Sequence, residues 1–440
     1  MQTTKTYFEP GRNLPIKKEV DVLVCGAGPS GFGAAVAAAR AGASTLLVEQ
    51  TSAVGGVATS GLMSHWTGDS EGPILDELLE RARVSDKDYN YYGTKVLKGK
   101  FINNPERTRQ AMVQMLREAG ASIQLYTMVA SAIREDNCVR GIITESKSGR
   151  EVILSKVVID ATGDGDVACK AGAAFIHGRE TDHATQPVTV MFKVAGVDTA
   201  RAIYPGEFED YIQVPNGEIQ ALGRKELPRP AGHVLLYPTG LPGVVTVNMT
   251  NQTGIDGTNV EDLTRGDMGC RDQIPIIVDF LRRNAPGYEN CYVINSAPML
   301  GVRETRHFEG LYVVNEDDLA QARVFEDWIA TRCYFNFDVH SLTGPGLDPT
   351  GAQNEFKQKR KYTIPYRAIV PKEVDGLLFA GRNISGTHIA HSNFRAMAIA
   401  LNIGQGAGVA AALSAKKGLQ PRGMDVSTIQ DVLRSQGVSP

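Results

Sequence analysis

The first 50 residues alternate short apolar runs with a longer, Ala-rich segment. A largely apolar run covers Val20–Cys25, an Ala-rich stretch follows over Phe32–Ala39, and a second apolar run covers Leu46–Val48. Buried parallel strands have such short continuous runs, and helices usually connect them. The pattern therefore predicts a strand, a helix and a second strand.

A second block, residues 104–173, continues this alternation. A helix is predicted from Pro105 to a C-cap at Gly120, and a turn is predicted at Lys147–Arg150. Four strands are predicted around them, at 122–125, 138–144, 151–154 and 157–160. The last strand runs into Ala161-Thr162-Gly163-Asp164, which indicates a tight turn at its carboxyl end.

A third block begins at Gly376. It predicts a strand, a Gly turn and a loop, followed by a helix that begins near Ser392 and ends near Leu413. Open parallel sheets bind ligands at the carboxyl ends of their strands. The three Gly turns of these blocks are therefore expected to face one crevice: Gly26, Gly163 and Gly381.

The intervening region, roughly 175–361, has a different pattern. Pro- and Gly-rich turns separate predicted strands at 189–194, 234–237, 244–249, 292–296 and 303–306. One long helix is predicted over Val260–Asn284, with Pro275 as a break or kink. We expect an α/β protein with a discontinuous Rossmann-like domain, an inserted α+β substrate domain and a C-terminal tail, at 20–174 with 362–420, 175–361 and 421–440, respectively.

The first Gly turn has the spacing of a dinucleotide-binding fingerprint, Gly26-x-Gly28-x-x-Gly31. Gly26 allows a tight turn, Gly28 lets the backbone approach a pyrophosphate, and Gly31 lets the helix pack on the sheet. The positive helix N-terminus then faces the anion. Glu49 ends the second strand, where a carboxylate suits a ribose diol and would repel a 2′-phosphate.

The residues that follow Glu49 favour FAD over other dinucleotides. Ala35, four residues after Gly31, and the pair Gly55-Gly56 extend the fingerprint in the manner of FAD-binding flavoproteins with two dinucleotide-binding domains. The alternative is a nicotinamide-binding Rossmann unit. Only one complete G-x-G-x-x-G unit is visible, so a dedicated NAD(P)H domain is not expected.

Taken together, the motifs resemble the FAD-dependent oxidoreductase family whose members share the fumarate-reductase and succinate-dehydrogenase-like flavoprotein fold. The resemblance covers most of the chain. It rests on the fingerprint with Glu49 and Gly55-Gly56, and on four further motifs: Asp160-Ala161-Thr162-Gly163-Asp164-Gly165-Asp166, Gly301-Val302-Arg303-Glu304-Thr305-Arg306, Tyr366-Arg367 with Gly381-Arg382-Asn383-Ile384-Ser385, and His388-x-x-His391-x-x-x-Arg395.

The resemblance implies a glutathione-reductase-type FAD-binding domain and a set of cofactor-binding residues. Many relatives carry Asp after the Gly of the final strand, whereas this chain has Arg382-Asn383. No His or Cys occupies a clear tethering position near Gly55-Gly56, so non-covalent FAD is expected, with His65 as the only nearby alternative. The expected FAD contacts are Gly26, Gly28, Pro29, Ser30, Gly31, Glu49, Gln50, Gly55, Gly56, Val57, Ala58, Val129, Ala161, Thr162, Gly163, Asp166, Gly381, Arg382, Asn383 and Ala396.

Two histidines and two arginines are the candidates for chemistry beside the flavin. His388 or His391 suits a general base, because an imidazole changes protonation state near neutral pH; structural histidines are the alternative. As a metal pair they lack a third ligand nearby in the sequence, and no metal is expected. The N-terminus of the helix near Ser392 is expected to stabilise charge on the reduced flavin.

Arg395 lies four residues after His391, on the same predicted helical face. It suits a substrate carboxylate or the reduced flavin, with a buried acid as the alternative partner. Arg303 belongs to a predicted strand whose alternation puts Glu304 and Arg306 on one face and Arg303 and His307 off it; a salt-bridge network is the alternative to substrate contact there.

Several further polar residues near the motifs suit a structural role as well as a cofactor contact. Trp66 and His65 follow the Gly-Gly turn and suit a flavin wall, although a core role for Trp66 is the simpler expectation. Asp164 and Asp166 suit either a ribose or the cap of the next helix, and the cap is the slightly stronger expectation.

Composition excludes some partners. The net charge is −3 without a dominant basic block, so nucleic acid is not an expected partner. The six cysteines show no C-x-x-C pair, which fits a reduced, cytoplasmic setting and excludes a redox dithiol. Met1–Glu19 lacks the apolar core of a secretory signal, and the apolar segment 396–415 is expected to be a buried helix rather than a membrane span.

These features predict an enzyme. The expected function is FAD-dependent hydride transfer between a small organic substrate, at a hydroxyl or a C–C bond, and non-covalently bound FAD. A second small molecule, a redox protein or oxygen would be the electron partner. A flavin monooxygenase is the alternative, and a non-enzymatic flavin-binding module is the least expected. The sequence selects neither the substrate nor the oligomeric state.

Overall fold

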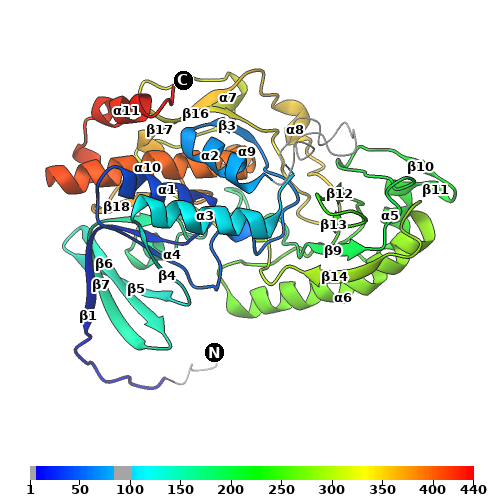
Figure 1. Cartoon of the computed structure of the whole chain (residues 1–440), viewed down its shortest axis with the longest axis horizontal. Helices are drawn as coiled ribbons and strands as arrows, with labels where there is room; N and C mark the ends of the chain where they lie inside the picture. Colours follow the sequence, from blue (N-terminus) through cyan, green and yellow to red (C-terminus); the bar gives the residue numbers. More distant parts are fainter. Residues whose placement is uncertain (1–5, 84–101) are drawn as a thin grey trace.

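A computed structural model describes residues 6–83 and 102–440 of the chain. The fold is mixed α/β. A seven-stranded sheet covered by helices forms one part of the molecule, and a smaller four-stranded sheet with a long helix lies at the other end (Figure 1). The sequence of Met1–Glu19 predicted no secretory signal, and its first five residues lie outside the described residues.

The seven-stranded sheet combines a parallel part with an antiparallel hairpin region. Its order is β4 (Ser122–Gln124), β2 (Thr45–Val48), β1 (Ile16–Cys25), β7 (Gly149–Asp160), β6 (Cys138–Ser146) and β5 (Met128–Glu135), and β18 (Leu377–Phe379) also pairs with β7. The β4, β2, β1, β7 and β18 pairs are parallel, whereas β5, β6 and β7 are joined antiparallel. The parallel sheet is as predicted from the apolar runs.

Two details of this sheet differ from the prediction. The segments 151–154 and 157–160 form one continuous strand, β7, because the polar residues between them lie within the pairing with β1. Strand β5 was not predicted, since its side chains are mostly half-buried and lack a clear apolar run.

Helix α1 (Pro29–Arg40) follows β1 and packs against α10 (Met397–Lys417). Their backbones approach closely at small residues: a Cβ built on Gly33 would lie 2.4 Å from the Leu401 carbonyl oxygen. Among the described residues α10 is the one helix long and apolar enough to cross a membrane, but 94% of its apolar window is buried inside the protein. The predicted buried helix is confirmed.

The predicted single helix from near Ser392 is wrong. The chain forms α9 (His388–Phe394), capped by the Thr387 hydroxyl, and then breaks before α10 begins at Met397. Ala396 is extended (φ −59°, ψ 143°), and the Met397 amide bonds to the Thr67 hydroxyl. The break lacks a Gly or Pro, so tertiary contacts rather than local sequence fix it.

The region between blocks two and three carries its own sheet and core. The order is β12 (Leu236–Pro238), β13 (Val245–Val247), β9 (Phe192–Ala195) and β14 (Tyr292–Ser296), all antiparallel. Helix α6 spans Val260–Asn284 as predicted, but Pro275 lies inside it and does not end it. Phe280 and Leu281 of α6 pack with Phe192 and Val245 in a separate apolar cluster.

The predicted strand at 303–306 is displaced. Strand β15 covers Arg306–Phe308 and pairs with β8 (Phe175–His177). A three-stranded sheet joins β17 (Tyr362–Pro365), β16 (Trp328–Tyr334) and β3 (Asp69–Glu71). The remaining elements are α2 (Pro73–Ala82), α3 (Pro105–Ala119), α4 (Asp166–Lys170), β10 (Gln213–Val214), β11 (Gly217–Glu218), α5 (Ile219–Glu226), α7 (Glu316–Ala320), α8 (Ala352–Glu355) and α11 (Val426–Ser435).

Candidate active site

The carboxyl ends of the parallel strands lie side by side. Cys25 at the end of β1 is in register with Val48 of β2 and with Asp160 of β7, and Asp160 is in register with Phe379 of β18. The turns that follow these strands therefore share one edge of the sheet. The predicted convergence of the Gly26, Gly163 and Gly381 turns is confirmed.

The three fingerprint glycines have different surroundings. Gly26 has φ +96°, and a Cβ on it would lie 2.4 Å from the Ala161 carbonyl oxygen. A Cβ on Gly31 would lie 1.7 Å from the Gly26 carbonyl oxygen, whereas one on Gly28 would meet nothing within 4 Å. Packing therefore requires the first and third glycines, and the second leaves open space beside the N-terminus of α1, where no side chain caps the first turn.

Glu49 is fixed at the edge of this turn. Its two carboxylate oxygens accept hydrogen bonds from the amides of Ala27 and Thr51, both at 2.8 Å. Each oxygen keeps a lone pair that can accept a ribose hydroxyl. The Gly55 amide donates to the Ala27 carbonyl oxygen, which holds the Gly-Gly pair against the fingerprint turn.

The second and third turns contact each other and the fingerprint. Arg382 Nη2 lies 2.6 Å from Asp164 Oδ1, and a Cβ on Gly163 would lie 2.2 Å from the Arg382 guanidinium. Ser30 of α1 donates to the Ala380 carbonyl oxygen at 3.2 Å. Asn383 donates to the Asp160 carbonyl oxygen at 3.0 Å, so its amide braces the end of β7.

The predicted capping roles of Asp164 and Asp166 are wrong. Thr162 Oγ1 accepts from the Asp166 amide, and Asp160 Oδ2 accepts from the Ala168 amide, so these two residues cap α4. Burial raises the pKa of Asp160 to about 6. The prediction chose the acids nearest the start of the helix in the sequence. The side chains that accept from its amides belong to Asp160 and Thr162, which precede those acids.

The other expected cofactor residues are distributed around these turns. Gln50 is exposed beyond Glu49, and Ala396 is the N-cap of α10. Val129 lies two residues beyond Thr127, whose amide bonds to the Glu49 carbonyl oxygen. Val57 and Ala58 form a short helical turn after Gly56.

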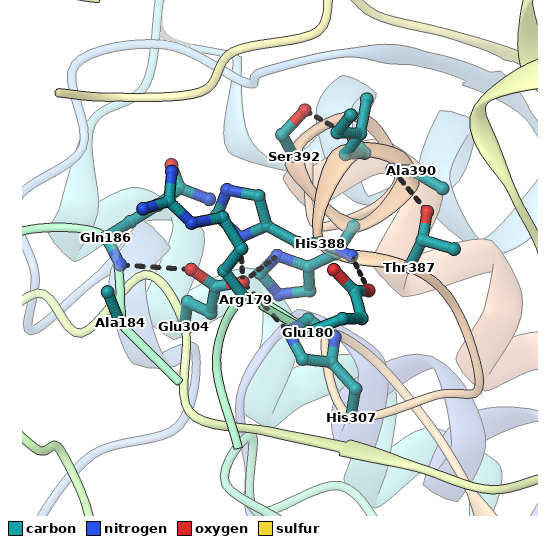
Figure 2. Close-up of polar contacts among 12 residues, drawn as sticks. Arg179, Glu180, Ala184, Gln186, Glu304, His307, Thr387, His388, Ala390 and Ser392 are labelled. Atoms are coloured by element: carbon teal, nitrogen blue, oxygen red, sulfur yellow. Dashed lines mark hydrogen bonds and ion pairs between the residues drawn. The ribbon is translucent and has the colours of Figure 1, made fainter. Parts of the chain in front are cut away.

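A buried cluster of one glutamate and three histidines lies where α9 meets the segment before β15 (Figure 2). Glu304 Oε1 lies 2.6 Å from His388 Nδ1 and 2.8 Å from His307 Nε2. His391 Nδ1 lies 4.0 Å from the same oxygen and has no hydrogen-bond partner. The Gln186 amide donates to the second carboxylate oxygen at 3.0 Å.

The predicted alternation at this segment is wrong. Glu304 and His307 meet rather than lie apart, because residues 303–305 precede the strand and do not alternate as a strand does. Arg306 turns away toward the Asp164 carbonyl oxygen and Asp166.

The pKa values of this glutamate–histidine cluster are shifted in different directions. Burial opposes the Glu304 charge, but hydrogen bonds from His307 and His388 outweigh it and lower its pKa well below the ordinary value. Burial likewise opposes protonation of His388, but Glu304 raises its pKa. Burial, together with His307, lowers the pKa of His391 well below its ordinary value, so this ring is neutral.

A second polar cluster contains both predicted arginines. Arg395 Nη2 lies 2.8 Å from Asp338 Oδ2, and His340 Nε2 lies 3.3 Å from the same oxygen. Arg303 donates to the Pro187 carbonyl oxygen and to Thr189. Burial lowers the pKa of Arg303 to about 10, and the charge of Arg395 adds to this shift.

A family model for FAD dependent oxidoreductases matches residues 21–433. The chain belongs to this family. Curated relatives of this FAD-dependent oxidoreductase include digeranylgeranylglycerophospholipid reductases from Methanosphaerula palustris (31% identity over 34% of this chain and 39% of that protein) and Methanosarcina acetivorans (28% over 51% and 53%). The chain thus spans about half or less of these two relatives.

Among solved structures, a geranylgeranyl bacteriochlorophyll reductase-like protein from Thermoplasma acidophilum is similar, with a TM-score of 0.50 and 13% identity. The match covers 95% of this chain and 84% of that one. At this identity the similarity concerns the fold alone.

The residues of this FAD-dependent oxidoreductase fit its cofactor. The uncapped N-terminus of α1 and the open space at Gly28 suit the diphosphate, and the fixed carboxylate of Glu49 suits a ribose diol. FAD is the cofactor of the protein.

Sequence reasoning missed several residues of the polar clusters. Asp338, His340 and Gln186 carry no motif signal. Asp338 and Gln186 reach Arg395 and Glu304 from distant parts of the chain, and His340 lies two residues from its partner Asp338. Trp66 is buried in the core, as the simpler expectation held. The His65 ring contacts the Tyr237 ring at a tilt of 60°, with ring centroids 5.2 Å apart.

Proposed function

We propose that this flavoenzyme transfers a hydride between non-covalently bound FAD and a small organic substrate that carries a carboxylate. The observation that carries the proposal is the excess of positive charge at Arg303 and Arg395. When bound, FAD supplies the hydride acceptor or donor. The chain's own residues bind and orient the substrate and handle the proton.

The charge balance around the arginines leaves room for an anion. Within the described residues, Asp338 is the only carboxylate at ion-pair distance from Arg395, and none is at that distance from Arg303. Burial lowers the pKa of His340 to about 4, and Arg303 adds to this, so His340 brings no charge near pH 7. A substrate carboxylate would compensate the remaining cation, and a guanidinium can hold it through two parallel hydrogen bonds.

The glutamate–histidine cluster supplies the acid–base group in this proposal. His388 is already bonded to Glu304 and favoured in its charged form, so it is poorly placed to accept a proton. His391 is neutral with an unpartnered ring nitrogen. Of the two predicted bases, the contacts therefore favour His391 or a group bound to it.

The finer fold assignment belongs to the same proposal. We assign residues 20–174 and 362–420 to a glutathione-reductase-type FAD domain of the fumarate-reductase-like subtype, 175–361 to an inserted substrate domain and 421–440 to a tail. This division is supported by the sheets, because the seven-stranded sheet uses residues before 161 and after 376, and the four-stranded sheet uses residues 192–296.

The buried polar side chains around Arg303 favour a small polar substrate over an isoprenoid chain of the kind named for the archaeal relatives. Tyr237, His233 and Asn248 lie in this part of the molecule, and His233 Nδ1 and Asn248 Oδ1 are buried without partners. Buried polar atoms are costly unless a partner satisfies them. A polar ligand provides such partners.

Anaerobic spectroscopy of the bound flavin tests the proposal. Hydroxy acids and dicarboxylates are added to the oxidised protein, and enoates to the reduced protein, each beside its neutral ester or amide. We expect a carboxylate to change the flavin spectrum and its neutral analogue to fail. Arg395→Met should abolish the response, whereas Arg201→Met, at an exposed ion pair, should retain it. Equal reaction of neutral analogues would contradict the proposal, and NAD(P)H-driven oxygen uptake would support a monooxygenase instead.

A further inference from the structure

Glu304, His307 and His391 direct their potential ligand atoms at one another. These atoms all lie within 4.8 Å of each other, and no other three His, Cys, Asp or Glu side chains do so in residues 6–83 and 102–440. The residues are 1%, 5% and 1% exposed. Two imidazoles and a carboxylate, brought together from α9 and the β15 segment, are an uncommon grouping for a protein interior.

The separations are close to those of ligands around one ion. His307 Nε2 and His391 Nδ1 lie 2.8 and 4.0 Å from Glu304 Oε1. Metal–ligand distances of about 2.1 Å put neighbouring ligand atoms roughly 3.0–3.4 Å apart. The two observed distances bracket this range, so small side-chain rotations suffice.

His391 provides an independent indication of a ligand. Its Nδ1 is buried without any hydrogen-bond partner, and it faces Glu304. A buried polar atom left without a hydrogen-bond partner is destabilising. A cation would give this nitrogen the partner that it lacks.

The carboxylate is also held as a metal ligand usually is. His388 Nδ1 bonds to Glu304 Oε1, and the Gln186 amide donates to Oε2 (Figure 2). Hydrogen bonds from such outer residues orient ligating side chains and tune the ion. Neither contact uses the nitrogens of His307 or His391, so both can persist when an ion is bound.

We propose that Glu304, His307 and His391 form a binding site for a divalent transition-metal cation. Two imidazoles and one carboxylate suit Zn²⁺ or Fe²⁺, and three protein ligands leave a position for water or a substrate oxygen. The ion takes the place of a hydrogen on Nε2 of His307, and the neutral imidazole then carries its single proton on Nδ1. The site goes beyond the proposed redox function, because binding requires no substrate.

Cobalt binding to tag-free, FAD-loaded protein tests the site. The protein is treated with a chelator, dialysed against Co²⁺ and analysed for metal content, with Zn²⁺ as a second probe. We expect one ion per chain, lost in His307→Ala and in His391→Ala. His388→Ala should weaken binding about 10–100-fold, as loss of an outer partner does. His233→Ala, which removes a buried histidine outside the cluster, should bind cobalt like the unsubstituted protein.

Absence of stoichiometric cobalt and zinc binding would overturn the proposal, as would binding that survives both ligand substitutions. If either variant fails to fold by circular dichroism, X-ray absorption of the cobalt-loaded wild type decides: two imidazole ligands support the site, and none refutes it. Flavin reduction is measured separately, so cobalt binding without any carboxylate-dependent flavin response would remove the proposed function and leave the cation site.

Discussion

Replacing Asp338 by Asn tests whether one carboxylate neutralises the arginine cluster. Asp338 exposes only 19% of its side chain and contacts Arg395 at 2.8 Å and His340 at 3.3 Å. Burial opposes its charge, but His340 and the arginines outweigh it and lower its pKa well below the ordinary value. In Asp338→Asn the shape is kept and the charge is removed, so Arg303 and Arg395 face each other without compensation.

The expected loss is large relative to ordinary protein stability. Removing one partner of a fully buried ion pair costs about 3–5 kcal/mol, because the other charge stays buried and unpaired, and this partly buried pair should lie near the lower value. Native proteins are stable by only about 5–15 kcal/mol, so the variant should lose at least about a fifth of its free energy of unfolding. The extra net positive charge should at the same time make a bound carboxylate more stabilising than in the wild type.

Urea denaturation at pH 7.5 measures both effects, with and without the carboxylate that reacts best with the flavin. Asp182→Asn is the matched control, since Asp182 pairs with Arg179 at an exposed site and its loss should leave the midpoint unchanged. An Asp338→Asn midpoint indistinguishable from the control would refute the argument that this carboxylate holds the two arginines.

Two further perturbations follow from the structure. Burial lowers the pKa of His233 to about 3 and of His340 to about 4, whereas both histidines titrate near 6.5 in the unfolded chain. The unfolded chain therefore binds more protons as the pH falls. The free energy of unfolding should decrease by about 2 kcal/mol per histidine between pH 7.5 and 5. His233→Gln should remove its share of this dependence in urea titrations, and an unchanged pH slope would contradict the assignment. Gly31→Ala should lower the melting temperature, because its Cβ meets the Gly26 carbonyl oxygen, whereas Gly28→Ala should melt normally without FAD but retain less flavin after gel filtration. Equal behaviour of the two Ala variants in both assays would argue against the separate roles of these glycines.

Local patterns predicted the elements whose signals lie within a few residues. The fingerprint turn, the parallel strands and the bounds of α6 all depend on spacing, capping or apolar runs, and the structure confirms them. The break between α9 and α10 could not be predicted, because distant contacts fix it: Arg395 donates to Asp338, and the Met397 amide donates to the Thr67 hydroxyl.

The polar clusters show a similar limit. The motifs drew attention to His388, His391, Arg395 and Arg303, and the structure places the two histidines in a buried cluster and the two arginines in a partly buried one. Glu304 lies 84 residues from His388, and only the fold brings their side chains together. The predicted strand alternation over residues 303–307 was wrong because alternation holds only where the backbone is paired as a strand. Pairing with β8 begins only at Arg306.

The contact between Ser30 and Ala380 spans 350 residues and has a consequence for biosynthesis. The ribosome makes β18, which pairs with β7, and α10, which packs on α1, long after it has made the fingerprint turn. Because synthesis proceeds from the N-terminus, the packing surface of α1 stays uncovered until α10 has been made. We therefore predict that a chain truncated before residue 376 does not retain flavin, even though its G-x-G-x-x-G sequence is intact.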